Sequence, residues 1–196
     1  MTVDDAAKLI AGARVDGKAE TWADLGCGDG TFTVALASIL PLASVVHAMD
    51  RDRSALQQVP RSYEGTSIVR HEGDFTSQPW PFSELDGVLL ANSLHYVRDQ
   101  ATLIRDCQRN MKPFGRFLIV EYDTDKGNPW VPYPVSVASL ERLFAGAGYS
   151  SIQMLGTRRS IYQRARIYAA LVSPFRYSRP SPTIPKTTNA PIARSL

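Results

Sequence analysis

A glycine-rich turn is the segment of this sequence whose residue types best suit ligand binding. The segment Asp24-Leu25-Gly26-Cys27-Gly28-Asp29-Gly30 follows an apolar run that is typical of a strand, and an apolar helical pattern follows it. Glycines allow positive φ angles and let a ligand approach the main chain closely. The helix start offers unpaired N–H groups at the same place. Tight structural turns use the same residues, so the turn alone leaves both interpretations open.

A second carboxylate strengthens the ligand-binding interpretation. Asp50 closes the next predicted strand, twenty residues after Gly30. In an open parallel sheet the ends of these two strands meet at one crevice, where an acidic residue can accept hydrogen bonds from both hydroxyls of a ribose. The alternative is that Asp50 only caps the helix that follows. Turn and carboxylate together predict a nucleoside cofactor.

The spacing of the glycines argues against a dinucleotide or a nucleoside triphosphate. A dinucleotide turn needs glycine or alanine three residues after its second glycine, and this chain has Thr31 there. The chain also lacks the glycine–lysine loop of phosphate-binding ATPases. Asp24, directly before the glycines, suits a cofactor with a cationic amino group better than a pyrophosphate.

Strands and helices alternate along the chain, which predicts an α/β fold. We expect a Rossmann-like seven-stranded, mostly parallel sheet with one antiparallel edge strand and with helices on both faces. The predicted strands are Glu20–Leu25, Ser44–Asp50, Ser67–Arg70, Leu85–Ala91, Arg116–Tyr122, Tyr149–Leu155 and Gln163–Leu171. The predicted helices are Val3–Ala13, Thr31–Leu40, a short one ending near Val59, Gln100–Met111 and one through residues 140–147.

Composition divides the chain into a domain, residues 1–172, and a tail, residues 173–196, rich in Pro, Ser, Thr and Arg. The tail holds five of the thirteen prolines, and we expect a flexible extension, with an arm packed on the body or on a partner as the alternative. It also holds four basic residues and no acid, so the net charge of +3 leaves about −1 for the domain. A nucleic-acid partner is therefore not expected.

No run of apolar residues is long enough for a membrane helix, and the acidic start lacks the apolar core of a secretory signal. We therefore expect a cytoplasmic protein with no membrane partner. The two cysteines, Cys27 and Cys107, have no spacing typical of a disulfide framework or a metal site, and His47 and His71 show no spacing that pairs them. No metal is expected.

Five ordered motifs resemble the class I S-adenosylmethionine-dependent methyltransferases of the small single-domain type. The first turn and Asp50 are two of them, and the others are Glu72–Phe75, Leu85–Tyr96 and Lys112–Glu121. The resemblance implies S-adenosyl-L-methionine as cofactor and S-adenosyl-L-homocysteine as product. The cofactor-binding residues that it implies are Asp24, Gly26, Cys27, Gly28, Asp50, Arg51, Gly73, Asp74, Phe75, Asn92 and Leu94.

The acceptor side is expected just past the ends of the later strands. There His95 is the candidate general base, because a neutral imidazole can take a proton near pH 7. A packing or capping role for His95 remains the alternative. Other residues expected to face the acceptor are Tyr96, Glu121, Tyr122, Asp123, Trp130 and Tyr133. The two carboxylates could instead hydrogen-bond nearby loops, and the last two aromatics could anchor their loop to the core.

The acceptor itself is narrowed by what the motifs lack. Methyltransferases of DNA bases carry Asn/Asp-Pro-Pro-aromatic where this chain has Asn92-Ser93-Leu94-His95. A small molecule with an O or N acceptor is the leading prediction, and the alternatives are a protein or RNA methyltransferase and an inactive cofactor-binding subunit or sensor. The segments that often cover the acceptor in the resembled family are short here. The acceptor could therefore be covered by a second subunit of a homodimer or by the tail, or it could be bulky and stay partly exposed.

Overall fold

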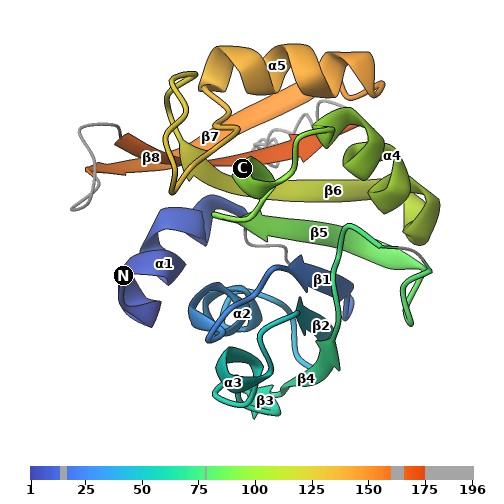
Figure 1. Cartoon of the computed structure of the whole chain (residues 1–196). Helices are drawn as coiled ribbons and strands as arrows, with labels where there is room; N and C mark the ends of the chain where they lie inside the picture. The colour runs from blue at the N-terminus through green and yellow to red at the C-terminus, as the bar shows by residue number, and fades with distance from the viewer. Residues whose placement is uncertain (14–16, 78, 160–165, 175–196) are drawn as a thin grey trace, which may run out of the picture.

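One eight-stranded sheet organises the computed structural model, which describes residues 1–13, 17–77, 79–159 and 166–174. The strand order is β3-β4-β2-β1-β5-β6-β8-β7 (Figure 1). The strands are β1 Thr21–Leu25, β2 Val45–Asp50, β3 Ser62–Tyr63, β4 Thr66–Glu72, β5 Leu85–Ala91, β6 Met111–Tyr122, β7 Ser151–Arg159 and β8 Arg166–Ser173. The helices are α1 Val3–Ile10, α2 Thr31–Ala37, α3 Arg53–Leu56, α4 Gln100–Asn110 and α5 Val137–Gly146, with 3-10 turns η1 Ala11–Ala13 and η2 Leu94–Tyr96.

The predicted fold class is confirmed, with two differences in the sheet. A two-residue strand, β3, adds an eighth strand by pairing antiparallel with β4. The reversed strand β8 lies between β6 and β7 and runs antiparallel to both, so it is not at the edge. β3 escaped prediction because two residues are too short for a hydrophobic period to appear. Residues 163–165 and 175–196, parts of the last predicted strand and of the tail, lie outside the described residues, and the division into domain and tail stays a prediction.

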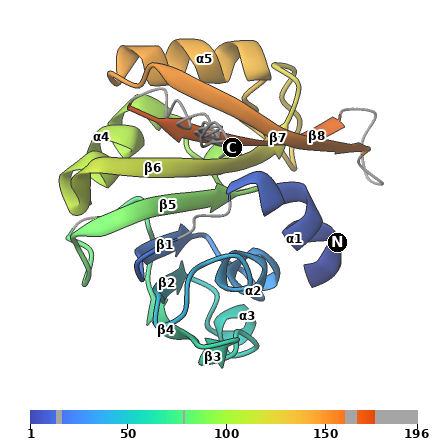
Figure 2. The same cartoon turned by 180° about the vertical axis from the view of Figure 1, so that it is seen from behind.

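The helices pack on both faces of the sheet, and a hydrophobic core lies on each face. Figure 2 shows α1, α2 and α3 on one side and α4 and α5 on the other. Trp22, Phe32 and Val46 belong to the first core, and Phe117 and Phe144 belong to the second. Alternation along each strand sends successive side chains to the two cores. None of the described helices has the length and apolar character needed to cross a membrane.

The direction of the chain connections reverses at β1. This strand pairs in parallel with β2 on one side and with β5 on the other. One connection leaves the end of β1 toward β2, while the chain later returns to β5 and β6 across the other face. In open α/β sheets the crevice at such a switch point is where ligands bind. The site is therefore expected between the ends of β1, β2 and β5.

Gly87 tests the packing between β1 and β5. A Cβ atom there would lie 2.5 Å from the ring of Trp22, which is fully buried. Gly87 lies on β5 and Trp22 on β1, so neither can shift without disturbing the central sheet. Gly87→Ala should therefore lower the free energy of unfolding by about 1–3 kcal/mol, measured by urea denaturation. Gly146→Ala is the control, since a Cβ at that helical position meets nothing within 4 Å. An equal change in both variants would contradict this account of the packing.

Candidate functional site

The first loop has the backbone geometry expected of a ligand cradle. Gly26, Gly28 and Gly30 have φ angles of +77°, +55° and +87°, which side chains rarely adopt. A Cβ on Gly26 would lie 2.7 Å from Cβ of Ser93, while a Cβ on Gly28 would meet nothing within 4 Å. Glycine is thus needed at Gly26 for close packing, and at Gly28 the loop faces open space that a ligand can fill.

Asp50 ties this loop to the end of β2. One carboxylate oxygen, Oδ2, accepts the N–H of Gly28 at 2.7 Å, and the other accepts the N–H of Asp52 at 2.8 Å. The cap of α3 is Asp52, whose side chain accepts from Ser54 and Ala55, so Asp50 does not fill that role. Each oxygen of Asp50 keeps further acceptor capacity, which fits the two hydroxyls of a ribose.

Asp24 is a buried carboxylate with one oxygen unused. Its Oδ2 accepts the Thr33 hydroxyl at 2.6 Å, whereas Oδ1 is buried with no partner among the described residues. Burial raises the pKa of Asp24 to about 7, and the charge of Asp50 acts in the same direction. A buried acceptor without a donor is costly. A cationic amino group in the adjoining cavity would satisfy it.

That cavity, of about 290 Å³, lies between the first loop and the end of β5. Asn92 at its wall has φ +53°, and its Oδ1, like Oγ of the neighbouring Ser93, is buried without a partner among the described residues. Strained backbone and unsatisfied polar atoms cluster at functional sites. The residues lining the cavity are Met1, Asp24, Gly26, Cys27, Gly28, Asp29, Thr31, Phe32, Ala91 and Asn92.

Five of these lining residues were not predicted. Asp29, Thr31 and Phe32 continue directly from the glycine turn, and Ala91 precedes Asn92, so adjacency to the motifs is a signal that could have found them. Met1 reaches the cavity only because α1 packs on α2, and no local sequence pattern announces that contact.

The loop after β4 lies at the other end of the crevice. Oδ1 of Asp74 accepts the N–H and the hydroxyl of Thr76 at 2.8 and 2.7 Å, and these bonds, with a smaller effect of the Arg51 charge, lower the pKa of Asp74. Phe75 reaches the first loop, since its ring lies 3.0 Å from where a Gly26 Cβ would be. Gly73 donates its N–H to the carbonyl of Asp50 at 3.0 Å. The residues predicted for the adenosine end are therefore brought together.

Leu94 differs from the other predicted cofactor residues. Its side chain is fully buried in the core under α4 and α5. Its carbonyl accepts the N–H of Val97 and the side-chain amide of Gln100, and Leu94 is not among the residues that line the cavity. The side chain holds η2 against the sheet and so positions the two residues on either side of it.

On the acceptor side, His95 and Glu121 form a buried pair. Nδ1 of His95 lies 2.7 Å from Oε2 of Glu121, and the backbone N–H of His95 donates to Oε1 at 3.1 Å. The rings of Tyr96 and Tyr122 flank the imidazole at centroid distances of 4.3 and 6.0 Å. The structure thus brings four of the predicted residues together from the ends of β5 and β6.

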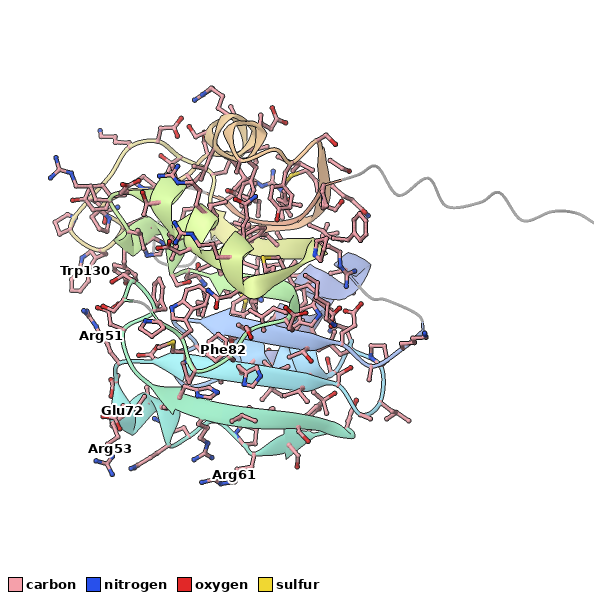
Figure 3. The ribbon with its side chains drawn as sticks, turned by 90° about the vertical axis from the view of Figure 1, so that its right-hand side faces the viewer. Arg51, Arg53, Arg61, Glu72, Phe82 and Trp130 are labelled. Carbon is pink, nitrogen blue, oxygen red and sulfur yellow. The ribbon has the colours of Figure 1, made fainter. Side chains whose placement is uncertain are left out.

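The loop after β6 contributes the remaining aromatics. Tyr133 donates its N–H to the carbonyl of His95 at 2.9 Å, and Trp130 is 80% exposed. Figure 3 places Trp130 and Arg51 at the edge of the molecule toward which the parallel strands point. Asp123 also lies here, but its Oδ1 accepts the N–H of Val137 at the start of α5, as the loop-bonding alternative supposed.

One expectation about the histidines is wrong. Parallel pairing of β2 with β4 brings His47 and His71 together, with Nδ1 and Nε2 3.0 Å apart. The register in which two strands pair cannot be predicted from the spacing of residues along the chain, so the sequence did not reveal the histidine pair. Burial, and to a lesser extent His71, lower the pKa of His47 to about 4, and its ring stacks on Phe82 (labelled in Figure 3). In the part of the chain that the structure describes, no three His, Cys, Asp or Glu residues are placed to hold a metal ion.

Both cysteines are buried free thiols. Cys27 lines the cavity, Cys107 is on the buried side of α4 in the second core, and burial raises the pKa of each thiol. A thiol held in its protonated form is a poor nucleophile. Their burial indicates a packing role.

Known proteins share both the sequence motifs and the fold. Residues 23–119 match the model of a methyltransferase domain family. A probable S-adenosylmethionine-dependent methyltransferase of Mycolicibacterium smegmatis is 26% identical over 141 residues, which are 68% of this chain and 53% of that protein. The chain belongs to the class I S-adenosylmethionine-dependent methyltransferases. S-adenosylmethionine is accordingly the cofactor of this domain, and the unpartnered Asp24 oxygen and the open face of Gly28 fit its amino-acid end.

Solved structures share the fold of this chain. YcgJ from Bacillus subtilis superposes with a TM-score of 0.65 at 12% identity, covering 87% of this chain and 98% of that one. Magnesium protoporphyrin IX methyltransferase from Synechocystis, solved with bound S-adenosylmethionine, superposes with a TM-score of 0.58 at 17% identity, covering 86% and 77%. The chain spans about half or less of the length of the first curated relatives that it matches.

Asp50→Ala tests the ribose assignment. Hydrogen bonds to a charged group contribute about 1.5–3 kcal/mol, so the variant should bind S-adenosylhomocysteine about ten- to a hundred-fold more weakly in a calorimetric titration. Asp52→Ala, two residues along, removes the α3 cap instead and is the matched control. Unchanged affinity in Asp50→Ala would count decisively against the assignment.

Asp24→Asn should stabilise the ligand-free protein at alkaline pH. The pKa of Asp24 is raised in the fold from 3.8 to about 7, so as pH rises between these values the unfolded chain loses its proton while the folded chain keeps it. Stability of the parent therefore falls over that interval, and the full cost, on the order of a few kcal/mol, is present above pH 7. Asparagine carries no such cost.

Urea unfolding at pH 5 and pH 8 should show a larger gain for Asp24→Asn at pH 8. The same variant should bind S-adenosylmethionine more weakly, because the carboxylate facing the cationic amino group is gone. A stability gain that is equal at the two pH values would refute the assigned cause.

Proposed function

We propose that this protein transfers the methyl group of S-adenosylmethionine to an oxygen or nitrogen atom of a small-molecule acceptor. The observation that carries the proposal is a set of exposed aromatic side chains on η2, next to His95, and on the loop after β6, which is hydrogen-bonded to the backbone of His95. Tyr96, Trp130 and Tyr133 are 62%, 80% and 41% exposed. Side chains of this kind are unusual on a free surface, and they bind planar or apolar ligands well.

The aromatic wall belongs to a loop that is firmly held. Asp125 accepts hydrogen bonds from Ser136 and Ser139, and Asn128 accepts from the N–H groups of Trp130 and Val131. Val131 and Val135 are buried beneath the loop. A wall fixed in this way can orient an acceptor without first paying to order itself.

Methyl transfer asks for placement more than for covalent help from the protein. When bound, the cofactor supplies an electrophilic methyl group on a sulfonium. Holding an acceptor atom in line with such a group can contribute about 7–11 kcal/mol. Residues of this chain supply that placement: Asn92 and the first loop on the cofactor side, and the aromatic wall on the other side. His95 is joined to the loop that carries the aromatic wall by the N–H of Tyr133, and in the proposed reaction it takes a proton from the acceptor.

The charge of the domain favours a small molecule over RNA. About −1 remains for the chain without residues 173–196, and a phosphate-binding surface would need a basic excess there. The magnesium protoporphyrin IX methyltransferase that shares the fold also acts on a small molecule, by its name.

A screen for S-adenosylhomocysteine release over pools of hydroxyl- and amine-bearing metabolites tests the proposal. We expect turnover with at least one planar acceptor. Asp50→Ala serves as the blank, because at a cofactor concentration near the parent's Kd its weaker cofactor binding should leave little turnover. Trp130→Ala should then raise the KM of that acceptor while the affinity for the cofactor stays unchanged. Cofactor binding with no turnover over the whole panel would point to a binding subunit or sensor, and turnover only with protein or RNA would also overturn the proposal.

A further inference from the structure

Glu121 is a carboxylate with no access to solvent. Its residue exposure is 0%, and that of His95 is 2%. Both oxygens of Glu121 are engaged by the same partner residue, Oε2 by the ring and Oε1 by the backbone N–H of His95. A buried charge is costly unless it is paired and hydrogen-bonded. The location of Glu121 therefore makes sense only in combination with His95.

His95 in turn is held from three directions. Glu121 binds Nδ1 and the backbone N–H, and the carbonyl of His95 accepts the N–H of Tyr133. The rings of Tyr96 and Tyr122 also contact the imidazole, the first tilted against it and the second edge-on. The imidazole consequently has little freedom to rotate, and its orientation is set by residues of β6 and of the loop after it.

The contact with Glu121 also selects a tautomer. An ionised carboxylate can only accept, so Nδ1 of a neutral His95 ring must carry the proton and Nε2 must carry the lone pair. The ring then offers Nε2 as its only proton acceptor. A general base needs this state, and a neighbouring carboxylate further stabilises the cation that forms when the base takes a proton.

We infer that Glu121 is a positioning residue that holds His95 in the Nδ1-protonated tautomer, so that Nε2 receives the proton of the acceptor. The inference rests on the proposed function. As the acceptor oxygen or nitrogen forms its bond to the methyl carbon, the bond from that carbon to the sulfonium sulfur breaks, its electron pair stays on sulfur, and S-adenosylhomocysteine is the leaving group. The acceptor's bond to hydrogen breaks, the proton is bound by Nε2, and the positive charge on the imidazole is balanced by Glu121. The sequence predicted that Glu121 faces the acceptor, but its burial and its pairing with His95 leave it no direct contact with one.

Glu121→Gln is the sharpest test because glutamine keeps the shape of the side chain but places an N–H donor where the carboxylate has an acceptor. The side-chain oxygen is needed by the backbone N–H of His95, so the amide NH₂ falls opposite Nδ1 and donates to it. His95 is then forced into the Nε2-protonated tautomer, which cannot act as the base. Nitrogen-15 NMR of the histidine ring should report protonated Nδ1 in the parent and protonated Nε2 in the variant.

Turnover should follow the tautomer. A general base contributes about 10²–10⁴-fold, so we expect kcat of Glu121→Gln to fall by at least about a hundred-fold, with the affinity for S-adenosylhomocysteine unchanged. Glu121→Asp retains a carboxylate and should keep the Nδ1-protonated tautomer and recover part of the rate. Glu141→Gln, which alters an exposed carboxylate on α5, is the matched control and should match the parent.

Two results would overturn the inference, and they differ from a failure of the proposed function. A parent protein whose ring is protonated on Nε2 refutes the tautomer assignment, whether or not any acceptor is found and whether or not the variants fold. Parental kcat in Glu121→Gln with a reversed tautomer refutes its importance for turnover. A parent that releases no S-adenosylhomocysteine with any acceptor overturns the proposed function and the proton transfer with it, while the NMR result stands separately.

Discussion

Parallel pairing of β1 with β2 on one side and with β5 on the other is the constraint on which the whole site depends. It brings the carboxyl ends of these strands to one edge of the sheet, so the loops that follow them lie next to one another there. The bond between the Asp50 carboxylate and the N–H of Gly28 then locks the first loop to the neighbouring strand. A residue at the end of β2 and a residue of the first loop thereby become parts of one cradle.

Buried carboxylates mark both halves of the site, and they serve different ends. Asp24 keeps one oxygen without a partner among the residues that the structure describes, and its burial raises its pKa. Glu121 has both oxygens engaged by His95. Unsatisfied polarity fits a group that waits for a ligand, and complete satisfaction fits a group that orients another side chain. The two environments separate cofactor binding from the handling of the acceptor's proton.

The acceptor side is built from rigid parts. Asp125 and Asn128 hold the loop after β6, and Tyr133 joins it to η2 through the carbonyl of His95. Trp130 stays exposed on that loop. Because the loop is anchored by the side chains of its own Asp125 and Asn128, side chains at its rim can vary without changing the fold beneath it.

The sequence by itself determined the cofactor half of this protein. Glycines with positive φ, an acid before them and an acid at the end of the next strand are local requirements, so they appear as residue types at short, fixed spacings. Periodicity likewise located all five helices and seven of the eight strands, because each long element buries one face or both. The order of β8 and β7 and the short strand β3 depend on pairing partners far along the chain, and local patterns carry no record of them.

Only the tertiary structure decided the partnerships of side chains. His47 and His71 meet through the register of β2 and β4, and His95 meets Glu121 through the register of β5 and β6, across 24 and 26 residues of sequence. Whether a carboxylate is free to bind an acceptor or is bound to a histidine is a matter of distance and burial. Those quantities arise when strands far apart in sequence pack side by side, and a linear pattern cannot express them.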